Sequence, residues 1–75
     1  MINIRDINFL EAFGKELRRL RHTKNLSQEA LADLADLSTS QIGRIERGKI
    51  NPSICTLKKI AEALGVKMSE MFDNL

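Results

Sequence analysis

Apolar residues recur at intervals of three or four along most of the chain, which is the spacing of one face of an α-helix. The first series consists of Leu10, Phe13, Leu17 and Leu20. Asn8 and Glu11 have the spacing of a capping pair at the start of a helix. Asn25 can adopt the left-handed backbone conformation that closes a helix. The pattern therefore predicts a first helix from about Phe9 to Lys24.

Three more helices are predicted, each beginning beside a residue whose hydroxyl can accept a hydrogen bond from the first turn. Their expected ranges are Gln28 to about Ala35 after Ser27, Ser38 or Thr39 to about Arg47, and Ser53 to Leu64. Residues that stop helices or form turns follow, namely Gly48, Asn51-Pro52-Ser53 and Gly65. A last short helix is expected from Ser69 to Asp73.

No segment has the alternating pattern of a strand, and no repeat or linker is apparent. The sequence thus predicts an all-α fold, a compact five-helix bundle. Residues 1–8 are expected to form an N-terminal extension and residues 9–75 one domain. The residues expected to face the interior from the second and fourth helices are Leu31, Leu34, Leu57, Ile60, Ala61 and Leu64.

A chain of 75 residues is the size of one small domain, with little room to enclose a cofactor and a catalytic cleft. No apolar run approaches the roughly 20 residues that cross a bilayer, and the N-terminus lacks the layout of a signal peptide. One cysteine, Cys55, and one histidine, His22, cannot form an internal disulfide or a zinc site. We therefore expect a cytoplasmic protein without metal, cofactor or small-molecule ligand, in which Cys55 is packed and His22 faces solvent.

The net charge of +2 is small, but the charges are unevenly distributed. Residues 1–25 are rich in basic side chains, the charged residues of 26–36 are all acidic, and residues 37–50 are basic again. The basic residues of the first and third segments are Arg5, Lys15, Arg18, Arg19, Arg21, Lys24, Arg44, Arg47 and Lys49. Local basic clusters permit nucleic-acid binding without requiring it.

The predicted second and third helices are joined by about three residues, so they must cross steeply, as in a helix-turn-helix. At about 100° per residue, Ile42 and Ile45 define the buried direction of the third helix. The residues expected on or near its outward side are Thr39, Ser40, Gln41, Gly43, Arg44 and Arg47. This side carries small, polar or cationic residues, and a helix of this width fits the DNA major groove. The alternative interpretation is an ordinary solvated helix face.

An ordered series of short motifs runs through this region. They are LSQEALA at 26–32, LSTSQI at 37–42, IERG at 45–48, NPS at 51–53 and LKKIAEALGV at 57–66. The series resembles the Cro and phage-repressor helix-turn-helix family, often called XRE, over about residues 9–72. It is also similar to the small restriction–modification controller proteins. The resemblance implies a lambda-repressor-like bundle and a transcriptional regulator, a repressor or autoregulator that binds a palindromic operator in double-stranded DNA as a homodimer.

Carried over position by position, the resemblance gives roles to individual residues. Thr39, Ser40 and Arg44 match positions that read bases, and Arg44 could bridge the O6 and N7 atoms of guanine. The residues expected to meet DNA phosphates are Gln28, Ser38, Gln41, Arg47, Lys49 and Asn51. Gln28 lies at the predicted start of a helix, where free N–H groups and the positive end of the helix dipole face an anion. For Gln28 and Arg47, an ordinary surface role is the alternative.

The family pattern also pairs an arginine late in the first helix with a glutamate late in the third, here Arg21 and Glu46. Glu46 lies at the edge of the buried face, where a carboxylate is costly unless a guanidinium neutralises it, so we expect a structural salt bridge. Asn25 and Asp36 replace glycines that are common in the family. Gly43 is a poor helix former inside the third helix. It could permit close approach of the backbone to the groove, or it could simply be tolerated.

Met68, Met71 and Phe72 form a short apolar set on the last predicted helix. Part of this set must close the core, and the rest is expected to contact a second copy of the chain. The N-terminal extension, residues 1–8, could pack there too. The alternative to a transcriptional regulator is an antitoxin-type protein-interaction module, in which DNA binding is secondary. An enzyme is not favoured, because the serine and threonine hydroxyls of the third helix lack a histidine base.

Overall fold

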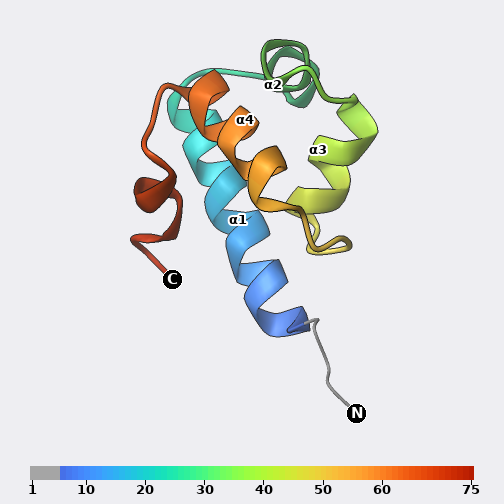
Figure 1. Cartoon of the computed structure of the whole chain (residues 1–75), viewed down its shortest axis with the longest axis vertical. Helices are drawn as coiled ribbons and strands as arrows, with labels where there is room; N and C mark the ends of the chain where they lie inside the picture. The colour runs from blue at the N-terminus through green and yellow to red at the C-terminus, as the bar shows by residue number, and fades with distance from the viewer. Residues whose placement is uncertain (1–5) are drawn as a thin grey trace.

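The computed structural model describes residues 6–75, and the regular elements of that part are all helical. In chain order they are α1 (Ile7–Thr23), α2 (Gln28–Ala35), α3 (Thr39–Glu46), α4 (Ile54–Leu64) and the 3-10 helix η1 (Met68–Phe72). Figure 1 shows α1 running most of the length of the molecule, with α2 at the end opposite the N-terminus. The predicted all-α fold is confirmed, with one correction, because the fifth element is a 3-10 helix and not an α-helix.

The first helix begins two residues earlier than the sequence pattern predicts. Asp6 caps it, in place of Asn8, because Asp6 Oδ1 accepts a hydrogen bond from the backbone N–H of Phe9 at 2.9 Å. Asn25 takes the expected left-handed conformation beyond the end of the helix, with a φ of 56°. The helix therefore includes part of the expected N-terminal extension, while residues 1–5 lie outside the described part of the chain.

Serine caps the next three helices, as predicted. The side-chain oxygens of Ser27, Ser38 and Ser53 accept hydrogen bonds from the backbone N–H group three residues on, at 3.0, 3.0 and 3.1 Å. Gln41 completes a capping box at the start of α3, since its Oε1 accepts from the backbone N–H of Ser38 at 3.0 Å. Asp36 ends α2 in the left-handed region with a φ of 56°, which is the conformation expected where the family commonly has glycine.

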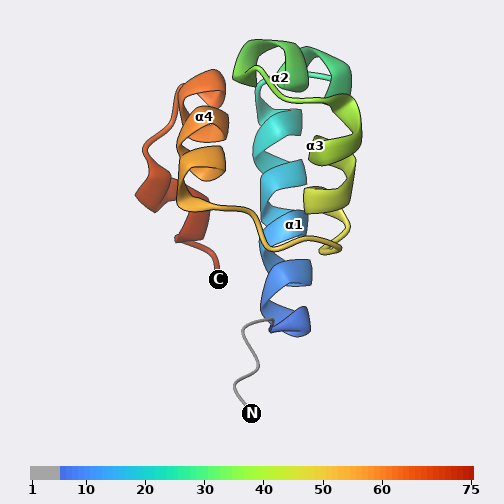
Figure 2. The same ribbon diagram turned by 45° about the vertical axis from the view of Figure 1, so that its right-hand side comes forward.

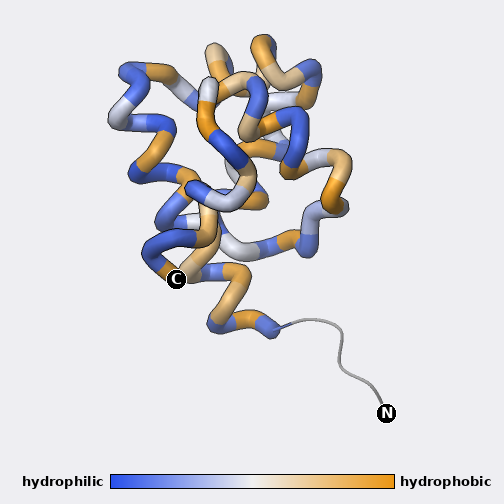
Figure 3. The backbone as a smooth tube through the Cα atoms, turned by 60° about the vertical axis from the view of Figure 1, so that its left-hand side comes forward, coloured by the Kyte–Doolittle hydropathy of each residue, from blue (hydrophilic) through white to orange (hydrophobic). Residues whose placement is uncertain are grey.

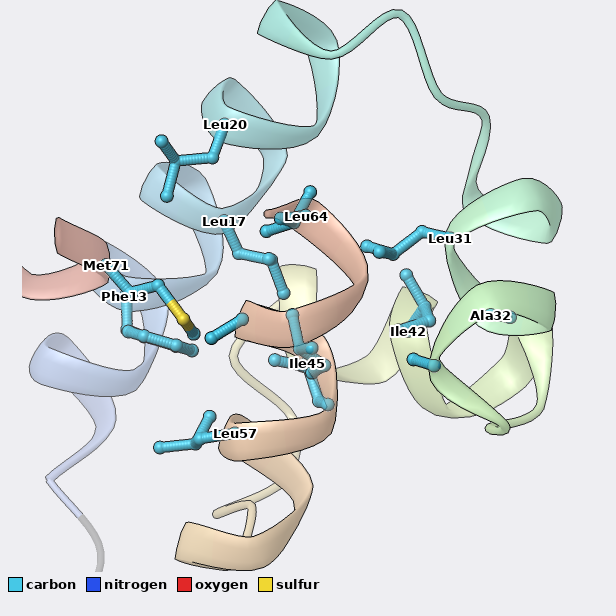
Figure 4. Packing of buried hydrophobic residues seen from close by; sticks show 13 residues of the cluster. Phe13, Leu17, Leu20, Leu31, Ala32, Ile42, Ile45, Leu57, Leu64 and Met71 are labelled. Carbon is cyan, nitrogen blue, oxygen red and sulfur yellow. The ribbon is translucent and has the colours of Figure 1, made fainter. Parts of the chain in front are cut away.

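One hydrophobic core lies between the helices, and side chains from α1 to α4 and η1 converge on it (Figure 4). Hydrophobic and hydrophilic residues are interspersed along the backbone (Figure 3), and each helix buries a set of apolar residues in the core. The buried core residues are Phe13, Leu17, Leu20, Leu31, Ala32, Ala35, Ile42, Ile45, Leu57, Ile60, Ala61, Leu64 and Met71. The predicted inner face of α4 is confirmed in full.

Two side chains lie elsewhere than the sequence pattern predicts. Leu34 is 62% exposed, because Leu31, Ala32 and Ala35 form the buried stripe of α2 and Leu34 lies about 100° from its centre. Cys55 is exposed and not packed. It precedes the buried Leu57 by two positions, which places it on the opposite side of α4.

The C-terminal segment is fixed to α1 by contacts that the sequence pattern does not predict. Glu16 is buried and accepts two hydrogen bonds from Arg19, each of 2.8 Å, and a third from Asn74 Nδ2 at 2.8 Å. The ring of Phe72 stacks on Phe13 with 5.2 Å between the ring centroids. The spacing of Glu16 and Arg19 on one helix could have indicated their pairing. Nothing in the local sequence points to Asn74.

Two glycines allow α3 to end close against α1. A Cβ atom on Gly14 of α1 would lie 2.6 Å from the carbonyl oxygen of Ile45, well inside van der Waals contact. Gly48 follows α3 with a φ of 71°, and a Cβ atom there would lie 2.8 Å from the Cα atom of Glu11. The close approach sets the position of α3 relative to the rest of the bundle.

Candidate nucleic-acid interface

Figure 2 shows α3 beside α1, connected to α2 by a turn at residues 36–38. Ile42 and Ile45 bury one side of α3 in the core, as predicted. Thr39, Ser40 and Arg44 are exposed on the other side. We call these three residues the α3 face. Ser40 and Arg44 are one helical turn apart, so their side chains leave the helix in nearly the same direction.

The α3 face carries a positive charge and no carboxylate. The one acidic residue of α3 is Glu46, and its side chain is buried on the inner side. The structure thus brings together the residues that the family resemblance assigned to base reading, at the N-terminal and central part of an exposed helix. Their contacts with bases stay a prediction.

Glu46 is held by two neighbouring helices. Arg21, near the end of α1, donates from Nε to Glu46 Oε2 at 2.6 Å and from Nη2 to Glu46 Oε1 at 3.0 Å, which is the expected salt bridge. Gln28 Nε2 donates to Glu46 Oε1 at 2.9 Å. Burial alone would raise the pKa of Glu46, but the hydrogen bonds from Arg21 and Gln28, together with the positive charges of Arg21 and Arg18, outweigh it and lower the pKa. Glu46 therefore stays ionised.

Gln28 is half-buried at the first position of α2, and its side chain is not a loose surface group. Its amide nitrogen carries two hydrogens, and the bond to Glu46 uses one of them. The second hydrogen and the N-terminal end of α2 remain compatible with the predicted phosphate contact. Sequence reasoning had no signal for the bond to Glu46, because it depends on how α2 crosses α3.

The other residues expected to meet phosphates lie around the two ends of α3. Ser38 and Gln41 bind each other in the capping box, so Ser38 Oγ and Gln41 Oε1 are already engaged. Arg47, Lys49 and Asn51 are exposed and follow α3 directly. These residues therefore lie within α3 or directly before and after it, and their roles toward DNA stay predictions.

Residues 6–75 carry neither a cluster of metal ligands nor a helix that could span a membrane. No group of three or more histidine, cysteine, aspartate or glutamate residues in this part is arranged to hold a metal ion. None of its helices is long and apolar enough to cross a bilayer.

Two helices joined by a short turn, with the second one free on its outer side, define a helix-turn-helix DNA-binding domain. A family model described as helix-turn-helix, HTH_3, matches residues 17–71. The chain belongs to this XRE-type family of DNA-binding transcriptional regulators, which is not a class of enzymes.

Three relatives illustrate the match. The control protein C.MunI of a Mycoplasma species is 42% identical over 64 residues, which are 84% of this chain and 86% of that protein. The crystal structure of the restriction-modification controller protein C.AhdI from Aeromonas hydrophila has a TM-score of 0.86 at 45% identity, covering 87% of this chain and 98% of that one. The HTH-type transcriptional regulator PuuR of Escherichia coli is 41% identical over 61 residues, which are 81% of this chain but 33% of PuuR.

Proposed function

We propose that this chain is a cytoplasmic transcriptional repressor or autoregulator that binds a palindromic operator as a homodimer, through a DNA-binding domain at residues 9–75. The observation that carries the proposal is the α3 face, where Thr39, Ser40 and Arg44 are exposed on a helix whose single carboxylate is buried. In such an arrangement the helix enters the major groove and its N-terminal residues meet base edges.

Direct readout then depends mainly on Arg44. A guanidinium can donate two parallel hydrogen bonds to guanine O6 and N7, which no other base presents in the same way. Ser40 can both donate and accept, so it specifies little, and the methyl group of Thr39 can contact a thymine methyl. We expect a guanine in each half-site opposite Arg44.

Phosphate contacts fix the position of the helix without reading sequence. Arg47, Lys49 and Asn51 follow α3, and Gln28 opens α2, so contacts from these residues would hold the DNA backbone beside the groove that α3 enters. C.MunI is a control protein and C.AhdI a restriction-modification controller protein. By this likeness, we propose that the chain regulates the genes of a restriction–modification system, including its own promoter.

A homodimer would place two α3 helices about 34 Å apart, in successive major grooves on one side of the duplex. Of the predicted contact residues, Met71 is fully buried in the core and unavailable to a partner. Phe72 is 36% exposed and Met68 is half-buried, so these two would make the contact. Sedimentation should give a dimer in the presence of operator DNA, and a strict monomer with and without DNA contradicts the dimer.

The decisive experiment is selection of bound duplexes from random DNA in vitro. We expect an inverted repeat whose half-sites lie one helical turn apart and contain guanine, which tests binding, symmetry and spacing together. A pool with no enriched sequence would contradict the proposal. If a pull-down from the native host recovered a stoichiometric protein partner instead, an antitoxin-type interaction module would be the better description.

A further inference from the structure

Gly43 lies in the middle of α3 on its predicted outward side, yet it is buried. Two side chains from different ends of the helix-turn-helix cover it. A Cβ atom on Gly43 would lie 3.1 Å from Arg47 Nη1 and 3.7 Å from Gln28 Oε1. The Arg47 guanidinium and the Gln28 amide therefore both lie over the backbone of α3 at Gly43, which has no side chain.

The position of each covering group has a structural cause. Arg47 follows Gly43 by one helical turn, and side chains in a helix lean toward its N-terminus, so the Arg47 side chain folds back over Gly43. The Gln28 amide reaches the same place from the start of α2, and its bond to Glu46 holds it there. Arg21 in turn fixes Glu46.

Glycine leaves this place open. A Cβ atom at position 43 would lie 3.1 Å from Arg47 Nη1, which is closer than an ordinary carbon–nitrogen contact, so the guanidinium would have to shift by a few tenths of an ångström. Glycine is a poor helix former, so its place inside α3 calls for a reason. The Arg47 guanidinium lies in the space above Gly43.

We propose that Gly43 is a positioning residue for DNA binding, which seats the Arg47 guanidinium beside Gln28 so that both groups meet one stretch of the DNA backbone. This inference rests on the proposed DNA-binding function and adds to it. Holding Arg47 before binding reduces the conformational entropy lost when DNA binds. Gly43 acts through Arg47 and need not touch DNA itself.

The test is a double-mutant cycle with Gly43→Ala and Arg47→Ala, measured on the selected operator and on random duplex at several salt concentrations. Gly43→Ala should weaken binding to both duplexes by about two- to fivefold, because a phosphate contact carries no sequence information. The slope of log affinity against log salt should become less steep, by up to about 0.9. In the Arg47→Ala background, Gly43→Ala should have no further effect. Lys59→Ala, on α4, is the control for loss of a positive charge away from α3.

Two outcomes of the binding experiment would overturn the inference. Equal losses from Gly43→Ala with and without Arg47 would mean that glycine permits close approach of the backbone to DNA. Unchanged binding and salt slope in Gly43→Ala would mean that the position of Arg47 does not depend on Gly43.

A measurement without DNA separates this inference from the proposed function. In the free protein, the NMR order parameter of the Arg47 Nε–H bond should exceed that of the exposed Arg44, and Gly43→Ala should lower the Arg47 value only. Equal order parameters for Arg44 and Arg47 in the wild type would contradict the inference that Gly43 positions Arg47. If the Arg47 order parameter depends on Gly43 as expected but the protein binds no duplex, the proposed DNA-binding function is contradicted while the placement of Arg47 by Gly43 stands.

Discussion

Arg21 and Glu46, 25 positions apart in the chain, are joined by two hydrogen bonds of 2.6 and 3.0 Å that tie the end of α1 to the end of α3. Arg21 Nη1 also donates to the carbonyl oxygen of Leu26 at 2.9 Å, just before α2. Gln28 donates to the same carboxylate from α2. A single ion pair therefore connects the three helices that set the orientation of the α3 face.

Arg21→Met should destabilise the fold strongly, because it leaves the buried Glu46 carboxylate without its counter-charge. We expect a loss of about 3 kcal/mol in the free energy of unfolding, measured by urea denaturation. Combining Arg21→Met with Glu46→Met should recover part of the loss, since apolar pairs often replace buried ion pairs at little cost. Lys15→Met is the control, because Lys15 is an exposed cation on the same helix. Equal losses for Lys15→Met and Arg21→Met would contradict this account.

Stability should fall with acid in a range set partly by Glu16. The hydrogen bonds from Arg19 lower the pKa of Glu16 from 4.5 to about 2, against the effect of burial, and Asn74 adds to the shift. Because the pKa is lower in the folded state than in the unfolded state, this stabilisation is complete above pH 4.5 and disappears as the pH falls toward 2. Glu16→Gln should be less stable at neutral pH, and its unfolding free energy should fall less over this range. Parallel pH curves for wild type and variant would show that Glu16 contributes nothing.

Arg44→Ala and Gln28→Ala should separate base reading from phosphate binding. Arg44→Ala should cost about 1–3 kcal/mol on the selected operator and much less on random duplex, because only the operator presents guanine at the right place. Gln28→Ala should weaken both duplexes by a similar factor. Fluorescence anisotropy at fixed salt measures the affinity of each variant, relative to the wild type, for the operator and for random duplex. Circular dichroism confirms that each variant is folded. Equal losses on both duplexes for Arg44→Ala would remove Arg44 from base reading.

Gly14→Ala and Gly43→Ala should change stability in opposite directions. At Gly14 a Cβ atom would meet the backbone of α3, which cannot move aside easily, so we expect a loss of about 1–3 kcal/mol. At Gly43 it would meet the movable end of Arg47, so the gain in helix propensity, about 1 kcal/mol, should dominate. Thermal unfolding of both variants tests the comparison. A rise in Tm for Gly14→Ala would contradict the close contact of α1 with α3.

Local rules were sufficient for most of the fold. Ser27, Ser38 and Ser53 mark helix starts because each cap bond joins residues three positions apart, and such bonds depend on nearby sequence alone. Leu34 was assigned to the core wrongly because, in a helix of eight residues, the buried direction is set by the elements that pack against it. The bond between Glu16 and Asn74 spans 58 positions, so no local pattern could reveal it.

The candidate site was predictable to a similar extent. The exposed positions of Ser40 and Arg44 follow from helical periodicity once Ile42 and Ile45 are assigned to the core. The bond from Gln28 to Glu46 and the fold of Arg47 over Gly43 depend on how α2 and α3 cross. Sequence reasoning left the role of Gly43 open for this reason.

The ion pair at Glu46 has a consequence for the partner molecule. Because α1 and α2 both bind the Glu46 carboxylate of α3, we expect that α3 does not tilt independently of the rest of the domain. If the chain binds its operator as the proposed homodimer, a stiff domain would leave the adjustment to the duplex, which would twist or bend between the half-sites. Flexible steps such as TA or CA in the central base pairs, which the protein does not contact, should then tighten binding. The operator sequence would in this way be recognised partly by its deformability.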